Sequence, residues 1–203
     1  MALKHALTAL AFGSLTALGA QAAVIDFDAH PTDFLTPIFD SGFRFDFDSA
    51  GWGVFGPGSS ACCSVNYNGT TSMFADGDRS SNAKVVMTVD GGGTFSISAL
   101  DAAVYWIGAP AGSIEVIGAI HGGGTVSTTL ATGGAWVHYA LSGFDNLDSL
   151  TIRDTTSGAF LGAPGFGIDN INTTPVPEPE TYALMLAGLA GLGLATRRKA
   201  AQQ

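Results

Sequence analysis

The sequence predicts an all-β protein, an antiparallel β-sandwich of jelly-roll type. Between residues 23 and 174, apolar and polar residues repeatedly alternate with a period of two, which is typical of strands with one buried face. The same region shows no sustained apolar period of 3.6 residues, so we expect no helix there. Turn signals rich in glycine separate the alternating segments at the short intervals typical of sandwiches.

The predicted strands follow one another closely along this domain. Gly42–Asp48 is the clearest, because its three phenylalanines share one face and must be covered by a second sheet. Residues 49–81, rich in Gly, Ser and Asn, predict a long loop with one short strand near residues 65–67. The other expected strands are Val24–Asp28, Val85–Val89, Thr94–Leu100, Ala103–Ile107, Ser113–Ile120, Gly124–Leu130, Trp136–Ala140, Ser149–Arg153 and Phe166–Ile171.

The N-terminal 22 residues have the pattern of a secretory signal peptide. Lys4 precedes an apolar segment at residues 6–18, and Ala20-Gln21-Ala22 is a small-x-small site that signal peptidase accepts. We therefore expect a signal helix within residues 1–22 and cleavage after Ala22. The domain at residues 23–174 is then exported through the inner membrane.

The C-terminal tail contains three chemically different blocks. Pro177 and Pro179 exclude a helix at its start. The apolar run that follows has about 14 residues and spans roughly 21 Å as a helix, less than the roughly 30 Å of a bilayer core. A single, marginal transmembrane helix is therefore predicted over residues 181–196. The basic residues after it act as a cytoplasmic stop: Arg197, Arg198 and Lys199.

The tail at residues 175–200 resembles the PEP-CTERM sorting signal of Gram-negative bacteria. Its core is Val176-Pro177-Glu178-Pro179. The resemblance implies recognition by an exosortase, a membrane-embedded cysteine transpeptidase-like enzyme that cuts near residues 176–179. The protein is then expected to be anchored transiently in the inner membrane and to end at the cell surface or outside the cell.

The domain also resembles the bodies of many PEP-CTERM exported proteins. The resemblance covers about residues 83–174 and includes the motif Phe166-Gly167-Ile168-Asp169-Asn170-Ile171. Those bodies look like jelly-roll carbohydrate-binding modules and galactose-binding-like domains. The resemblance implies that the domain binds exopolysaccharide or has a structural role in the extracellular matrix.

The same resemblance implies a structural calcium ion. In several jelly-roll glycan-binding families an acidic residue near the first strand and an aspartate in a terminal Ile-Asp-Asn-like motif share Ca²⁺. Asp26, Asp28, Asp169 and Asn170 fall at the corresponding places, and oxygen ligands suit calcium. The alternative is that the period-two pattern places these side chains on the solvent face.

Aromatic rings are the other candidates for sugar contacts. Trp52, among glycines in the predicted long loop, is the first choice, and Trp106 is the second. Tyr105 and Trp106 are neighbours on a predicted strand, so we expect them to face opposite ways. Trp136 is favoured as a core residue.

Charge and motif content exclude several classes of function. The domain has four bases against fourteen aspartates and Glu115, a formal charge of −11, which argues against nucleic acid as a partner. No H-E-x-x-H zinc pattern and no G-x-S-x-G nucleophile elbow occur. We therefore expect a protein that is not an enzyme. A small extracellular glycan-acting hydrolase is the alternative, because two catalytic carboxylates can come from anywhere in a sequence.

Overall fold

The computed structural model describes residues 23–30, 36–48, 51–57, 65–76, 83–155, 165–176 and 188–189. The chain divides into two compact units, and Ala20–Glu178 contains all the strands. The second unit comprises Met1–Gly19 and Pro179–Gln203, of which the structure describes residues 188–189, in helical conformation. Within the described residues, no helix is long and apolar enough to cross a membrane. The predicted signal helix, the rest of the 181–196 helix and the basic stop lie outside them.

Twelve strands form from the described residues, in agreement with the predicted all-β class. They are β1 (Ala23–Ile25), β2 (Ile38–Asp40), β3 (Phe43–Asp48), β4 (Gly51–Phe55), β5 (Ser72–Asp76), β6 (Lys84–Val89), β7 (Thr94–Val104), β8 (Gly112–Ile120), β9 (Thr125–Thr132), β10 (Val137–Ala140), β11 (Leu147–Asp154) and β12 (Phe166–Val176).

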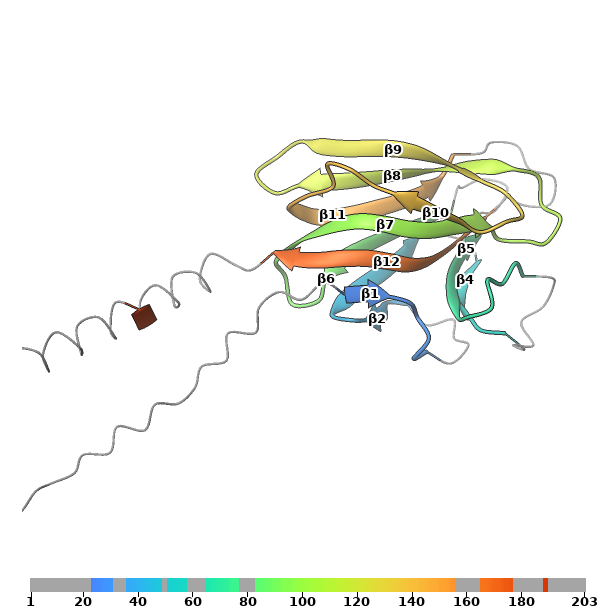
Figure 1. Cartoon of the computed structure of the whole chain (residues 1–203), viewed down its shortest axis with the longest axis horizontal. Coiled ribbons are helices and arrows are strands. Elements are labelled where there is room, and N and C mark those ends of the chain that lie inside the picture. The colour runs from blue at the N-terminus through green and yellow to red at the C-terminus, as the bar shows by residue number, and fades with distance from the viewer. Residues whose placement is uncertain are drawn as a thin grey trace, which may run out of the picture. The chain divides into compact units, whose positions relative to one another are not determined.

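The strands form two antiparallel ladders. The β11 sheet has the order β2-β3-β6-β11-β8-β9, and the β7 sheet has the order β4-β5-β12-β7-β10, with β1 beside the C-terminal half of β12. Among the described residues, one pair, Leu147 with Phe95, joins the two ladders. In Figure 1 the strands β7, β12 and β1 lie in front of β6. The protein is thus an antiparallel β-sandwich of jelly-roll type, as the sequence predicts.

The main core lies between the two sheets. Its side chains come from both ladders. Phe43 on β3 packs edge-on against Phe95 on β7 with ring centroids 5.4 Å apart, and Phe45 packs against Phe27 at 5.3 Å. Phe43 and Phe45 are 1% exposed, and Phe47 packs partly buried against the same core. The predicted phenylalanine face of this strand is therefore covered.

A second, smaller core covers part of the outer face of the β7 sheet. Met73 and Ala75 of β5 belong to the main core, whereas Phe74 between them points the other way. Phe74 packs there with a group of side chains that we call the aromatic cluster. Its members are Phe55, Val65, Tyr67, Phe74, Tyr105, Trp106 and Trp136.

The segment of residues 65–70 is bound across this outer face. The Asn66 backbone N–H donates to the carbonyl of Tyr105 at 3.0 Å. The Asn66 side-chain amide donates to the carbonyls of Val104 and Gly134 at 3.2 and 3.1 Å, and the Trp136 Nε1–H donates to the Asn66 carbonyl at 2.9 Å. These bonds satisfy the buried polar groups of the segment.

The prediction of a long loop at residues 49–81 was wrong, because this stretch contains β4 and β5. Their period-two pattern is obscured by the glycines of β4 and by burial of both faces of β5. Tyr105 and Trp106 also differ from the expectation. The strand β7 runs unbroken from Thr94 to Val104 and ends before them, so the two rings meet edge to face at 4.3 Å instead of facing opposite ways.

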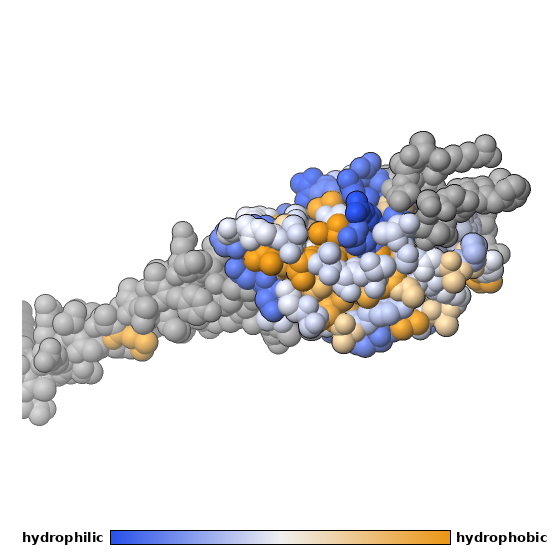
Figure 2. Space-filling model, turned by 90° about the horizontal axis from the view of Figure 1, so that it is seen from above, coloured by the Kyte–Doolittle hydropathy of each residue, from blue (hydrophilic) through white to orange (hydrophobic). Residues whose placement is uncertain are grey.

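The rest of the surface carries few large apolar side chains. Val24, Phe39, Ile107 and Val137 are the exposed ones in the strand-bearing unit, within the described residues. Figure 2 shows small hydrophobic groups among hydrophilic residues on the face it presents. Scattered apolar residues of this kind are normal on a water-exposed domain.

Gly167 provides a test of how tightly the aromatic cluster is packed. A Cβ at this position would lie 2.7 Å from the Phe74 ring and 2.9 Å from the Trp136 ring. Gly167→Ala should therefore lower the free energy of unfolding by about 1–3 kcal/mol. Gly134→Ala is the matched control, because nothing lies within 4 Å of its Cβ position. Urea unfolding measures both, and equal stabilities would contradict the packing described here.

Candidate functional site

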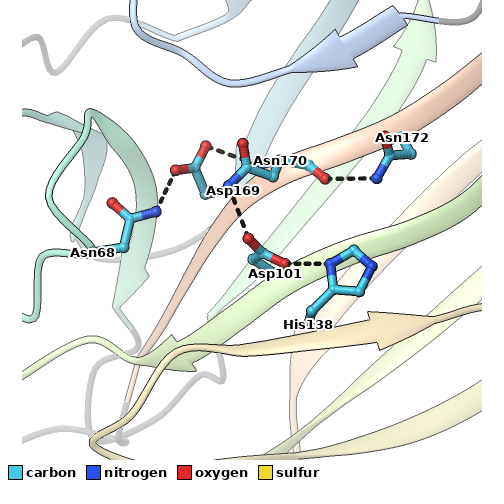
Figure 3. A network of polar contacts seen from close by, with 6 residues as sticks. All are labelled: Asn68, Asp101, His138, Asp169, Asn170 and Asn172. Atoms are coloured by element: carbon cyan, nitrogen blue, oxygen red, sulfur yellow. Dashed lines mark hydrogen bonds and ion pairs between the residues drawn. The ribbon is translucent and has the colours of Figure 1, made fainter.

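A row of polar side chains crosses the outer face of the β7 sheet beside the aromatic cluster. His138 on β10 is opposite Asp101 on β7, and Asp101 is opposite Asp169 on β12. The His138 Nδ1 lies 2.7 Å from Asp101 Oδ1, and the Asn170 side-chain amide donates to Asp101 Oδ2 at 2.8 Å. Figure 3 shows these contacts running from strand to strand. The row thus comes from three adjacent strands.

A break in the register of β12 places these groups. The pairing of β12 with β7 shifts between Asp169 and Asn172, and Asn170 has a φ of 49°. Asparagine tolerates this left-handed conformation better than most residues do. As a result Ile168 and Ile171 both enter the main core, while Asp169 stays on the outer face.

Asp169 is fully buried beneath the segment of residues 65–72. Its Oδ2 accepts hydrogen bonds from the Asn68 amide at 2.5 Å, from the Thr70 hydroxyl at 3.0 Å and from the Ser72 hydroxyl at 3.4 Å. Its Oδ1 accepts from the Asn170 backbone N–H at 2.8 Å. The buried carboxylate is therefore surrounded by donors, which offset part of its desolvation cost.

The environment raises the pKa of Asp169 to about 6. Burial is the main cause, since it disfavours the charged form, and the nearby carboxylate of Asp28 acts in the same direction. The hydrogen bonds from Asn68, the Asn170 backbone and Thr70 lower the pKa but do not cancel the effect of burial. Asp169 is thus a buried acid that titrates near neutral pH.

The structure brings together some of the predicted calcium ligands. Asp28 contacts the same segment, where its Oδ1 accepts from the Thr71 backbone N–H at 2.9 Å, and it is close enough to Asp169 to raise the pKa of that carboxyl. Asp26 instead accepts from the Asp28 backbone N–H at 3.2 Å, and the side chain of Asn170 turns to Asp101. Asp28 and Asp169 are therefore close to each other, whereas Asp26 and Asn170 have other partners.

The oxygens around Asp169 fit a hard cation in chemical type. The carboxylate of Asp28 is near enough to raise the pKa of Asp169. Asn68 Oδ1 lies 2.8 Å from the Thr70 hydroxyl and 3.0 Å from the Ser72 hydroxyl, and both hydroxyls also lie within 3.4 Å of Asp169 Oδ2. Calcium takes oxygen ligands of these kinds in flexible geometry. In the part of the chain that the structure describes, no three His, Cys, Asp or Glu side chains lie close enough together to hold a metal ion. A cation here would therefore depend on neutral oxygens as well as on Asp28 and Asp169.

The two tryptophans predicted to contact sugar, Trp52 and Trp106, lie in different parts of the domain. The backbone of Trp52 lies in β4 opposite Ala75, and its side chain is outside what the structure describes. Trp106 is half-buried against the aromatic cluster. Trp136, favoured as a core residue, is also half-buried there and contacts Phe74 at 6.2 Å between ring centroids.

Sequence reasoning missed several residues of this site. Asp101 had a signal, because it interrupts the apolar stretch of β7 between Leu100 and Ala102. The sequence gives no such signal for the side chains of Asn68, Thr70 and Ser72, because they lie in the stretch that was predicted to be a loop. His138 gives no signal in the sequence, because it has no zinc-type spacing to another histidine.

The comparisons with known proteins address the tail and the fold. Residues 175–199 match the PEP-CTERM protein-sorting motif. Comparison with curated protein sequences finds no match. The chain therefore carries the sorting signal of exported proteins that an exosortase processes and that the C-terminal region anchors transiently in the membrane.

Solved structures share the fold at low sequence identity. An exo-β-agarase has a TM-score of 0.52 and 10% identity, over 78% of this chain and 26% of the enzyme chain. An arabinose-bound α-L-arabinofuranosidase has a TM-score of 0.50 and 13% identity, over 80% and 27%. A family 29 carbohydrate-binding module mutant has a TM-score of 0.49 and 12% identity, over 79% and 99%. This chain spans about a quarter of each of the two enzymes, and the likeness to them concerns the fold alone.

The buried carboxylate predicts a defined pH dependence of stability. The pKa of Asp169 rises from 3.8 to about 6 on folding, so its contribution to stability is complete below about pH 4 and is lost as the pH rises to about 6. Asp169→Asn cannot ionise. Its stability relative to the wild type should increase across this window, by on the order of 2–3 kcal/mol, and then stay constant. Urea unfolding from pH 3.5 to 8 in EDTA measures the difference, and parallel curves would contradict the assignment.

Proposed function

We propose that the domain binds extracellular polysaccharide through the outer face of the β7 sheet, without catalysis. The observation that carries the proposal is the row of His138, Asp101 and Asn170 beside the aromatic cluster. Imidazole, carboxylate and amide groups are planar donors and acceptors that suit the paired hydroxyls of sugars. His138 is 62% exposed and Asp101 is 21% exposed, so both can reach a ligand.

The row is pre-organised before any ligand arrives. Both oxygens of Asp101 have protein partners, His138 and the Asn170 amide, and these lie on neighbouring strands rather than on loops. Groups that are already fixed lose little conformational freedom on binding. This arrangement supports recognition of a weakly binding, repetitive ligand such as a polysaccharide chain.

Aromatic surface lies next to the polar row. Gly167 and Asp169 are two residues apart on β12 and so share a face. The Trp136 ring packs over Gly167, 2.9 Å from where a Cβ would lie. The rings of the aromatic cluster therefore continue the face that carries the row. An apolar ring beside fixed polar groups is the combination that sugar-binding surfaces need.

The sorting signal supports a ligand of this kind, because it marks the chain as an exported protein. An exported protein released from the inner membrane meets exopolysaccharide at the cell surface or in the extracellular matrix. We therefore propose this final location, and exopolysaccharide as the partner. The likeness of the fold to carbohydrate-binding proteins supports the proposal at the level of the fold only.

We also propose that Asp28, Asp169 and the oxygens of residues 68–72 hold a structural Ca²⁺. The ion would neutralise the repulsion between the two carboxylates and stabilise the ionised form of Asp169. It would also tie residues 68–72 to β12 and to the turn that follows β1.

Glycan binding can be tested with a matched pair of histidine variants. His138→Ala removes one end of the polar row and should weaken retention by exopolysaccharide in affinity gel electrophoresis at least tenfold. His121→Ala is the control, because His121 is 63% exposed and pairs with Asp148 at 2.8 Å, much as His138 pairs with Asp101. Equal retention of both variants would overturn the proposed site. Release of reducing sugar by the wild type would favour the hydrolase alternative.

Calcium binding has its own test. Titration of the domain with Ca²⁺ should release heat and raise the melting temperature, and Asp169→Asn should abolish both effects. Asp46→Asn is the control, because Asp46 is an exposed partner of Arg44 on β3. Wild-type protein that shows neither heat nor a melting shift would remove calcium from the proposal.

A further inference from the structure

The sorting motif overlaps the folded domain. The motif spans residues 175–199, whereas β12 runs to Val176. Within β12, Thr174 is opposite Ser96, Pro175 is opposite Phe95 and Val176 is opposite Thr94. The first two residues of the motif are therefore part of the β7 sheet.

The other end of the exported domain lies at the same pair of strands. Ala23, the residue after the predicted signal-peptidase site, is the first residue of β1. Ala23 is opposite Thr173, and the Thr173 hydroxyl donates to the Ala23 carbonyl at 3.1 Å. Both predicted processing sites therefore border one antiparallel strand pair, β1 with β12.

We propose that pairing with β7 makes the N-terminal end of the sorting signal inaccessible to the enzyme that cuts it. Residues 174–176 must then separate from β7 before the signal is cut. The inference rests on the proposed processing by an exosortase. An enzyme that cleaves a chain binds it in extended form, with its backbone N–H and C=O groups available on both sides of the bond. A cut within or next to residues 176–179 needs groups that β7 already engages.

The C-terminal end of β12 can separate from β7 without unfolding the rest of the strand. Ile171, Asn172 and Thr173 lie opposite β1, and β7 flanks the same stretch of β12 on its other side. Beyond Thr173, the described residues provide β12 with β7 alone as a partner, and Pro175 has no N–H to donate. Opening of residues 174–176 is therefore a local event that leaves the pairing of β1 intact.

The rate of cleavage should therefore depend on how often residues 174–176 separate from β7. When opening is fast compared with cleavage, the rate of cleavage follows the population of the open strand end. A tighter pairing of residues 174–176 with β7 should then slow the release of the domain from the membrane, and a looser pairing should accelerate it.

A reversible disulfide lock tests the inference. Ser96→Cys with Thr174→Cys joins an opposed pair of β7 and β12 that lies just outside the motif at residues 175–199. Such pairs have Cα separations of about 4.5–5.5 Å, within the range for disulfides. The control is Ile117→Cys with Ser127→Cys, an opposed pair of β8 and β9 far along the other sheet. Both chains comprise residues 1–203 and carry Cys62→Ser and Cys63→Ser, which replace the two cysteines of the sequence so that the engineered pair forms the disulfide. They are incubated with membranes from exosortase-containing bacteria.

The readout is loss of the Arg197–Lys199 end, followed by mass spectrometry over time. We expect the oxidised lock to slow this loss at least tenfold, reduction to restore it and the oxidised control pair to leave it unchanged. A six-residue Gly-Ser spacer inserted between Thr174 and Pro175 leaves the motif intact and should restore cleavage of the oxidised lock, because the motif then no longer needs the sheet to open.

The possible failures are distinguishable. Equal rates for the oxidised and reduced lock, while the wild type is processed, would overturn the inference and leave the sorting proposal intact. A spacer that restores nothing would also overturn it, because the lock would then act by another route. If the wild-type chain keeps its C-terminal end in these membranes and loses nothing, the sorting proposal is wrong and the inference falls with it.

Discussion

Burial of β12 on both of its faces is the constraint on which the rest of the structure depends. One face carries Phe166, Ile168 and Ile171 into the main core, and the other carries Gly167 against the aromatic cluster and Asp169 beneath residues 68–72. A strand buried on both sides needs partners on both edges and a cover over each face. The strands β1, β5 and β7 supply the edges, and the segment of residues 65–70 supplies the second cover.

The same burial gives the candidate site its electrostatic character. A carboxylate placed under a cover of backbone and hydroxyl groups keeps a raised pKa, because its donors do not fully replace water. The neighbouring Asp101, by contrast, remains partly exposed and is held by His138 and Asn170. The two aspartates are opposite each other on adjacent strands, yet one is buried and bound to the covering segment, whereas the other is partly exposed beside His138.

Charge is distributed differently on the other sheet. The bases of the domain that the structure describes, Arg44, Lys84 and Arg153, each pair with an acid. They lie on β3, β6 and β11, so these pairs belong to the β11 sheet. The pairs are solvent-exposed and add little to stability. They neutralise Asp46, Asp48 and Glu115, but the same sheet also carries Asp40, Asp148 and Asp154, so both sheets share the acidic excess of the domain.

The sequence by itself determined the sandwich, most of its strands and the sorting tail. It did so because alternation of side chains along a strand and the order of proline, apolar and basic blocks are local patterns. It also marked Asp169 as unusual, a charged residue inside an apolar strand. Only the tertiary structure decided which groups surround that carboxylate, because Asn68 and Thr70 are about a hundred residues away in the chain and meet it through the sheet order. The strands β4 and β5 were likewise decided by packing, since burial on both faces removes the alternation by which a strand is recognised.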